Sequence, residues 1–137
     1  MTTFDHEKLD VYQISLEFVM TAGEIIRKFP TGRHNLADQL DRAATSVVLN
    51  IAEGAGEFSR AEKARFYRMA KRSATECAAA PDICRVRKVI DEKMFDVGRV
   101  MLLRIVAMLI RMIQGLEAGE HRERKTVTIS QPPQPPP

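Results

Sequence analysis

The chain has no tryptophan and few other aromatic residues, with two tyrosines and six phenylalanines among 137 positions. Leucine, isoleucine, alanine and methionine supply its apolar side chains instead, a mixture that favours helices over sheets. The most apolar segment, 100–113, is too short to span a bilayer and is interrupted by Arg104 and Arg111. The first ten residues show no basic segment followed by an apolar one, so we expect no secretory signal and a cytoplasmic protein.

Residues that commonly bind metals or catalyse reactions are also scarce. Cys77 and Cys84 are the only cysteines. On a continuous helix their α-carbons would lie about 10 Å apart, too far for a disulfide, so we expect both in the core. His6, His34 and His121 lack the spacing of a zinc site, and no nucleophile elbow or dinucleotide fingerprint is present. We therefore expect no metal, no cofactor and no enzyme activity.

Apolar residues recur at helical spacing in four segments, at about 6–29, 35–55, from 60 to beyond 84, and 91–116. Gly54 and Gly56 can close the second segment in the left-handed conformation. Ser59 and Glu62 form a capping box for the third, in which Pro81 predicts a kink, and Asp91 can cap the fourth. The predicted inward residues are Leu9, Tyr12, Leu16, Val19, Gly23 and Ile26; then Leu36, Leu40, Val47 and Ile51; then Phe66, Ala70, Ser73, Cys77, Ala80 and Cys84; then Phe95, Leu102, Ile105, Leu109, Met112 and Leu116.

Short connections between four amphipathic helices predict an all-α fold, an antiparallel up-down-up-down four-helix bundle over residues 1–117. Residues 118–137 are predicted to form a polar, Pro-rich C-terminal tail, whose last seven residues favour polyproline II. The fourth helix carries a second apolar stripe beside the first. We expect this second stripe to bury surface against another subunit, and its members are Leu103, Val106, Ile110 and Ile113.

Basic residues are concentrated in the third helix. Residues 60–90 contain nine basic and three acidic residues, a net charge of +6, whereas residues 1–59 have a net charge of −4. Five side chains on this helix form the predicted nucleic-acid-binding face: Arg60, Arg65, Arg68, Lys71 and Arg72. Such a face suits phosphate backbones, although a solvated helix face is the alternative. Tyr67 is the best placed aromatic residue for stacking on a base.

A polar stripe runs beside the apolar stripe of the second helix and faces two residues of the third. Its members are Gln39, Arg42, Ser46, Asn50, Glu53, Ser73 and Glu76. Unpaired burial of these groups would be costly, so the stripe predicts either a structural hydrogen-bond network or a binding pocket. We favour the structural network. A catalytic pocket around Asn50 and Glu53 is the weaker alternative.

Many of these positions together resemble a known family. The matching residues are Phe29-Pro30, Leu36, Gln39-Leu40, Arg42-Ala43-Ala44, Ser46, Asn50-Ile51-Ala52-Glu53-Gly54, Gly56, Ser59, Glu62, Phe66, Ala70, Ser73 and Glu76. The segment 4–114 thereby resembles four-helix-bundle proteins related to those encoded by intervening sequences of bacterial 23S ribosomal RNA genes. Accessory proteins of diversity-generating retroelements are a more distant branch. The chain departs from the family pattern at Glu57, Arg72 and Pro81.

The resemblance implies a ring-like homo-oligomer, with a pentamer favoured, and a nucleic-acid partner, and it implies no enzyme activity. Together with the basic helix it predicts a non-enzymatic module that binds RNA or DNA. The alternative is a protein-interaction scaffold that recruits a protein partner. Neither function involves a membrane.

Overall fold

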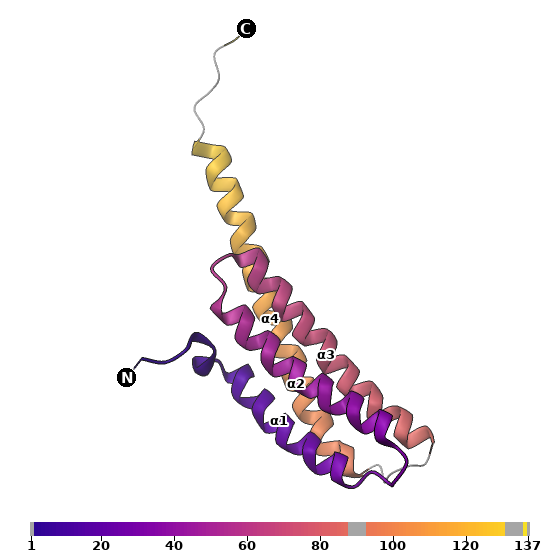
Figure 1. Cartoon of the computed structure of the whole chain (residues 1–137). Helices are drawn as coiled ribbons and strands as arrows, with labels where there is room; N and C mark the ends of the chain where they lie inside the picture. The colour runs from indigo at the N-terminus through magenta and orange to yellow at the C-terminus, as the bar shows by residue number, and fades with distance from the viewer. Residues whose placement is uncertain (1, 88–92, 131–135, 137) are drawn as a thin grey trace.

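The computed structural model describes residues 2–87, 93–130 and 136, with the helical backbone alone for Met94, Glu120 and 123–130. A 3₁₀ turn, η1 (Asp5–Lys8), precedes α1 (Asp10–Arg27), α2 (His34–Gly56), α3 (Arg60–Val86) and α4 (Lys93–Ser130). No strand occurs among these residues. Consecutive helices reverse direction, and each packs against two neighbours in the cycle α1, α2, α3, α4 (Figure 1). The predicted all-α four-helix fold is confirmed.

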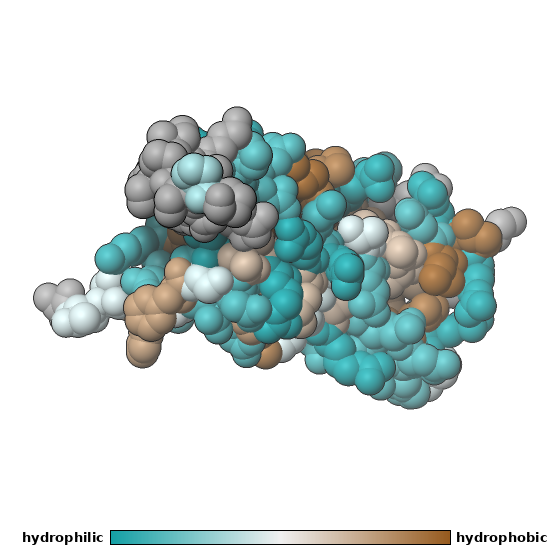
Figure 2. Space-filling view, turned by 90° about the horizontal axis from the view of Figure 1, so that it is seen from above, coloured by the Kyte–Doolittle hydropathy of each residue, from teal (hydrophilic) through white to brown (hydrophobic). Residues whose placement is uncertain are grey.

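The core lies between the four helices and contains the inward stripes predicted for α2 and most of α4. Leu40, Val47 and Ile51 of α2 are at most 1% exposed, and Ile105 and Leu109 of α4 are fully buried. The visible face in Figure 2 is mostly hydrophilic, with hydrophobic residues in small separate groups. Because amphipathic helices of this length have one strongly apolar side, periodicity was sufficient to orient α2.

The predicted stripe of α1 is wrong by one position. The buried apolar residues are Val11, Ile14, Phe18, Ala22 and Ile25. Four residues of the predicted stripe are only partly buried beside the core, and Leu16 is 40% exposed. Ser15 is also buried, and its hydroxyl is satisfied by the hydrogen bond that it donates to the Tyr12 carbonyl at 2.6 Å. The apolar arc of α1 is wide and has a polar residue, Ser15, in its middle. The sequence-based prediction therefore placed the inward stripe one position away from the observed one.

On α3 the prediction was partly correct. Ala70, Cys77, Ala80 and Cys84 are buried as expected, but Phe66 and Ser73 are only half-buried. Tyr67, Ala64 and Ala74 are buried in addition. Both cysteines are free thiols, as expected from their spacing. The helix continues through Pro81 to Val86, and the kink predicted there stays a prediction.

The end of α4 differs from the prediction. The helix continues to Ser130 instead of ending near Leu116, so segment 118–130, predicted as part of the tail, is helical. Beyond the bundle it projects as a single helix (Figure 1). Glu, Ala, Arg and Lys in this segment are good helix formers, and the helix stops shortly before Pro132. The predicted cap Asp91 and nearly all of the Pro-rich run lie outside the described residues.

Gly54 and Gly56 do not have the left-handed conformation predicted for them. Gly32, between α1 and α2, is the glycine with positive φ, at 93°. Gly54 lies inside α2 where α3 approaches most closely, because a Cβ added there would lie 2.7 Å from Tyr67 Cε1. The small residue is therefore needed for contact between the two helices.

Candidate nucleic-acid interface

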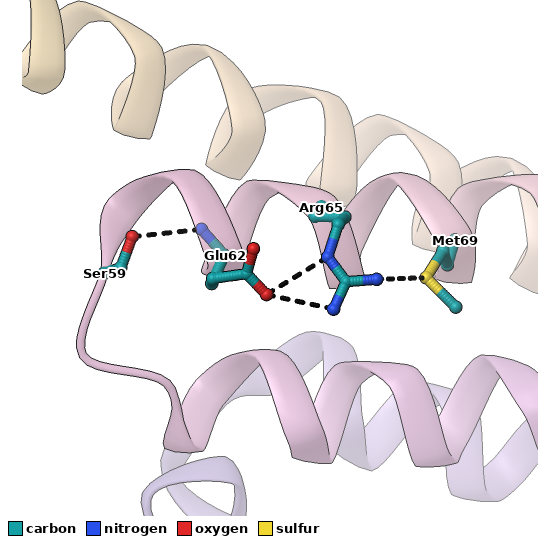
Figure 3. Close-up of polar contacts among 4 residues, drawn as sticks. All are labelled: Ser59, Glu62, Arg65 and Met69. Carbon is teal, nitrogen blue, oxygen red and sulfur yellow. Dashed lines mark hydrogen bonds and ion pairs between the residues drawn. The ribbon is translucent and has the colours of Figure 1, made fainter.

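The first half of α3 carries a line of polar contacts along one side (Figure 3). Ser59 Oγ accepts a hydrogen bond from the Glu62 backbone N–H at 3.3 Å, which confirms the predicted N-cap. The Glu62 carboxylate does not complete the capping box but accepts from Arg65 at 3.1 and 2.9 Å. The guanidinium of Arg65 also reaches Met69 Sδ at 3.7 Å and lies 4.6 Å from the centre of the Phe66 ring. Glu62 thus holds Arg65, and its hydrogen bonds raise the pKa of that guanidinium.

The other predicted binding residues follow along α3. Arg60 is exposed at the start of the helix and lies against α4, since a Cβ on Gly119 would be 2.8 Å from an Arg60 guanidinium nitrogen. Arg68 is half-exposed and pairs with Glu117 of α4. Lys71 is partly buried and Arg72 is exposed. All five predicted basic residues therefore have part of their side chain open to solvent.

Arg68, Lys71, Arg72 and Thr75 line a hollow of about 410 Å³ on the outer side of α3. Their spacing of three, one and three residues places them on one side of the helix. We call this feature the α3 hollow. Three of its four lining side chains are cationic, so it presents positive charge to solvent.

Tyr67 is buried, at 4% exposure, and is not available for base stacking. Its burial raises the pKa of the phenol. The ring packs against Gly54 of α2. Phe66, which was predicted to be in the core, is the half-buried aromatic residue beside Arg65. The predicted stripe contained Phe66, whereas the structure has Tyr67 in the core and Phe66 at its edge.

Three residues of the predicted polar stripe form a hydrogen-bonded cluster between α2 and α3. The hydroxyls of Ser46 and Ser73 are 2.8 Å apart. The Asn50 amide donates to the Ser46 carbonyl at 2.9 Å and to its hydroxyl at 3.0 Å. The cluster satisfies partly buried polar atoms in the seam, as expected of a structural contact.

The remaining members of the stripe are not part of this cluster. Arg42 Nε donates to the Asp38 carbonyl of its own helix at 3.4 Å. Gln39, Glu53 and Glu76 are exposed, and their side chains make no hydrogen bond to any residue that the structure describes. The exposed carboxylates of Glu53 and Glu76 add negative charge beside the basic face.

Two contacts at this surface were not predicted. Lys63 Nζ donates to the carbonyls of Gly54 and Ala55 at 3.3 and 2.7 Å, and thus caps the C-terminal end of α2. A lysine seven residues past the end of α2 was the available signal. Glu117, which pairs with Arg68, lay at the predicted end of the bundle and carried no sequence signal.

None of the described helices is long and apolar enough to cross a membrane. Within 2–87 and the described part of α4, no three His, Cys, Asp or Glu side chains are grouped so that they could hold a metal ion.

Comparison with known proteins identifies the family. The family model for the 23S rRNA-intervening sequence protein matches residues 7–111. A solved structure of a protein of unknown function from the S23 ribosomal protein family of Bacteroides thetaiotaomicron is 22% identical, with a TM-score of 0.68. The match covers 75% of this chain and 97% of that one, and shows a shared fold. No curated protein matches. Since the family model spans most of the bundle, the chain belongs to the 23S rRNA-intervening sequence protein family.

Proposed function

We propose that this protein is a non-enzymatic, oligomeric helical-bundle module that binds the phosphate backbone of RNA or DNA through the outer side of α3. One observation carries the proposal: Arg60, Arg65, Arg68 and Arg72 are exposed and Lys71 partly so on a single helix. Cations in such a row release counterions when they meet successive phosphates, which drives binding independently of base sequence. The burial of Tyr67 favours backbone binding over base stacking.

The two ion pairs on this side of α3 are compatible with binding. The side chains of Arg65 and Glu62 are 54% and 46% exposed, and those of Arg68 and Glu117 are 46% and 51% exposed. Exposed ion pairs contribute little to stability because water screens them. Phosphate oxygens can therefore replace the carboxylates at low cost.

The oligomer is supported by apolar side chains on the outer surface of α4. Val97, Val100 and Leu103 are 60%, 59% and 58% exposed. Leu103 belongs to the second stripe, whereas Ile113 of that stripe is buried within the chain and Val106 and Ile110 are partly buried. Contact with another subunit would remove the exposed residues from water. A ring, with the pentamer favoured by the family resemblance, would repeat the basic side of α3.

Light scattering at micromolar concentration should give a multiple of the 15.5 kDa chain mass; a monomer would contradict the ring.

The test of nucleic-acid binding compares the wild type with Arg65→Glu/Arg68→Glu/Arg72→Glu on mixed-sequence RNA and duplex DNA over a salt series. We expect the wild type to bind more weakly as salt rises, with a logarithmic slope of about −0.9 per phosphate contact on duplex DNA. The triple variant should lose this binding. The control Arg27→Glu/Lys28→Glu/Arg33→Glu makes the same change in charge at exposed positions near the turn between α1 and α2.

A folded triple variant that binds like the control variant would exclude α3 as the interface. No binding by the wild type at low salt would exclude the proposed function. A second candidate function would then come first, a scaffold for a protein partner. It is favoured by Phe58, which is fully exposed at 102% in the connection between α2 and α3.

A further inference from the structure

The basic residues of α3 fall into those that line the α3 hollow and those that lie outside it. Arg65 lies outside the hollow and is held by Glu62 and Phe66. Lys71 and Arg72 line the hollow, and among the described residues neither of their charged groups has a hydrogen bond or ion pair. The hollow thus contains the two cations on this helix that have no protein partner among those residues.

The fourth lining residue, Thr75, cannot readily donate to a ligand. Its hydroxyl donates to the Lys71 carbonyl of its own helix at 3.0 Å. The hollow therefore offers a ligand the guanidinium groups of Arg68 and Arg72 and the ammonium of Lys71. One guanidinium group can donate two parallel hydrogen bonds to the oxygens of a phosphate, whereas an ammonium acts as a point charge. This combination suits a single phosphate group.

One side chain from another helix affects this charge. Glu117 of α4 pairs with Arg68 and is half-exposed, at 51%. A phosphate that entered the hollow would compete with this carboxylate for the Arg68 guanidinium. It would also experience repulsion from the carboxylate over a short distance. Glu117 therefore lowers the affinity of the hollow for anions.

We propose that the α3 hollow binds one phosphodiester group of a nucleic acid through Arg68, Lys71 and Arg72, and that Glu117 competes with this phosphate for Arg68. The proposal rests on the proposed nucleic-acid function and adds to it the position of one phosphate and a residue that weakens its binding. It predicts that removal of an acidic residue outside α3 tightens binding, and that the effect depends on Arg68.

The experiment measures the affinity of labelled single-stranded RNA and of duplex DNA for five variants over the same salt series. Glu117→Gln should bind about fivefold more tightly than the wild type, because a like charge at short range is removed. Lys71→Gln and Arg72→Gln should each bind more weakly and reduce the salt slope by about one. Comparison of the RNA and DNA arms shows which nucleic acid supplies the phosphate.

The matched control is Glu62→Gln. It makes the same change in net charge as Glu117→Gln. It also opens an ion pair of similar exposure, but the arginine that it releases lies on α3 outside the hollow. Its effect on affinity should be smaller than that of Glu117→Gln. The fifth variant, Arg68→Gln/Glu117→Gln, should not bind more tightly than the wild type, because the residue released by the loss of Glu117 is absent.

The outcomes separate the two proposals. If salt-dependent binding is present but Glu117→Gln and Glu62→Gln have equal effects, net charge alone explains the gain, and the role of Glu117 is wrong. If Lys71→Gln and Arg72→Gln bind like the wild type while the triple arginine variant does not, the phosphate lies elsewhere on α3. Absence of binding by every variant would overturn the proposed function and this inference together.

Discussion

Along α3 the side that faces the bundle carries mainly alanine and cysteine, whereas the opposite side carries arginine and lysine. Ala70, Ala74, Cys77 and Cys84 are all 0% exposed. Small residues at these positions allow the neighbouring helices to pack closely against α3. The outer side makes a few half-exposed polar contacts. On the inner side of α3 the packing therefore restricts the size of the side chains. On the outer side their charge can be changed with little effect on folding.

The largest effect should come from added volume on the inner side. Ala74→Leu adds three carbon atoms at a position with no exposed surface, and should destabilise the fold by about 1–3 kcal/mol or more. The control Ala79→Leu makes the same change at an exposed position of α3 and should alter stability by less than about 0.5 kcal/mol. Urea unfolding of both variants provides the measurement. Equal stability of the two would contradict the distinction between the sides.

The inner side should also respond to alkaline pH. Burial, with a smaller contribution from Glu76, raises the pKa of the Cys77 thiol to about 12. In the unfolded chain a thiol loses its proton near pH 8.5. Between these values the unfolded state binds fewer protons than the folded state, so stability falls as pH rises, by at most about 1.4 kcal/mol per pH unit from this group.

Cys77→Ala isolates this contribution because alanine does not titrate. The stability of the wild type relative to Cys77→Ala should therefore decrease between pH 8 and pH 11. Urea unfolding of both proteins at intervals of half a pH unit measures the difference. A difference that stays constant over this range would mean that the Cys77 thiol titrates alike in the folded and unfolded chain.

A smaller effect is expected where α2 meets α3. Gly54→Ala would place a Cβ 2.7 Å from Tyr67 Cε1 and 3.0 Å from Phe66 Cβ, so the Tyr67 ring or one of the two helices must shift. The net cost should be about 1 kcal/mol, after the better helix propensity of alanine is included. Gly23→Ala in α1 meets no atom within 4 Å and should stabilise the protein by about 0.5–1 kcal/mol. Thermal unfolding should show a lower Tm for Gly54→Ala and a higher Tm for Gly23→Ala than for the wild type. A higher Tm for both variants would show that the α2–α3 contact is loose.

Much of the fold could be predicted because it depends on local periodicity. The bounds of α2 differ from the predicted ones by one residue at each end. The register of α1 could not be predicted, since its apolar arc is wide and its rotation about its own axis depends on α2 and α4. The end of α4 was missed because a helix that leaves the bundle has no inward stripe to mark it.

The site was predicted in part for the same reason. The five basic residues of α3 follow from one charged segment, and the structure places all of them at least partly in solvent. The hydrogen bond between Ser46 and Ser73 joins the polar stripe of α2 to one of the two α3 residues predicted to face it, whereas the other, Glu76, makes no such contact with the described residues. The prediction that Tyr67 is available for stacking was wrong, because Tyr67 is the buried one of two adjacent aromatic residues and only their packing partners distinguish them.

The amino-acid sequence by itself determined the four helices, their class of fold and the concentration of positive charge on α3, because each of these depends on residue order within one segment. The tertiary structure decided which rotation α1 adopts, why Gly54 lacks a side chain and which acid faces Arg68. These features depend on contacts between helices. In the pair Arg68 and Glu117, 49 positions separate the partners, and no local pattern connects residues so far apart.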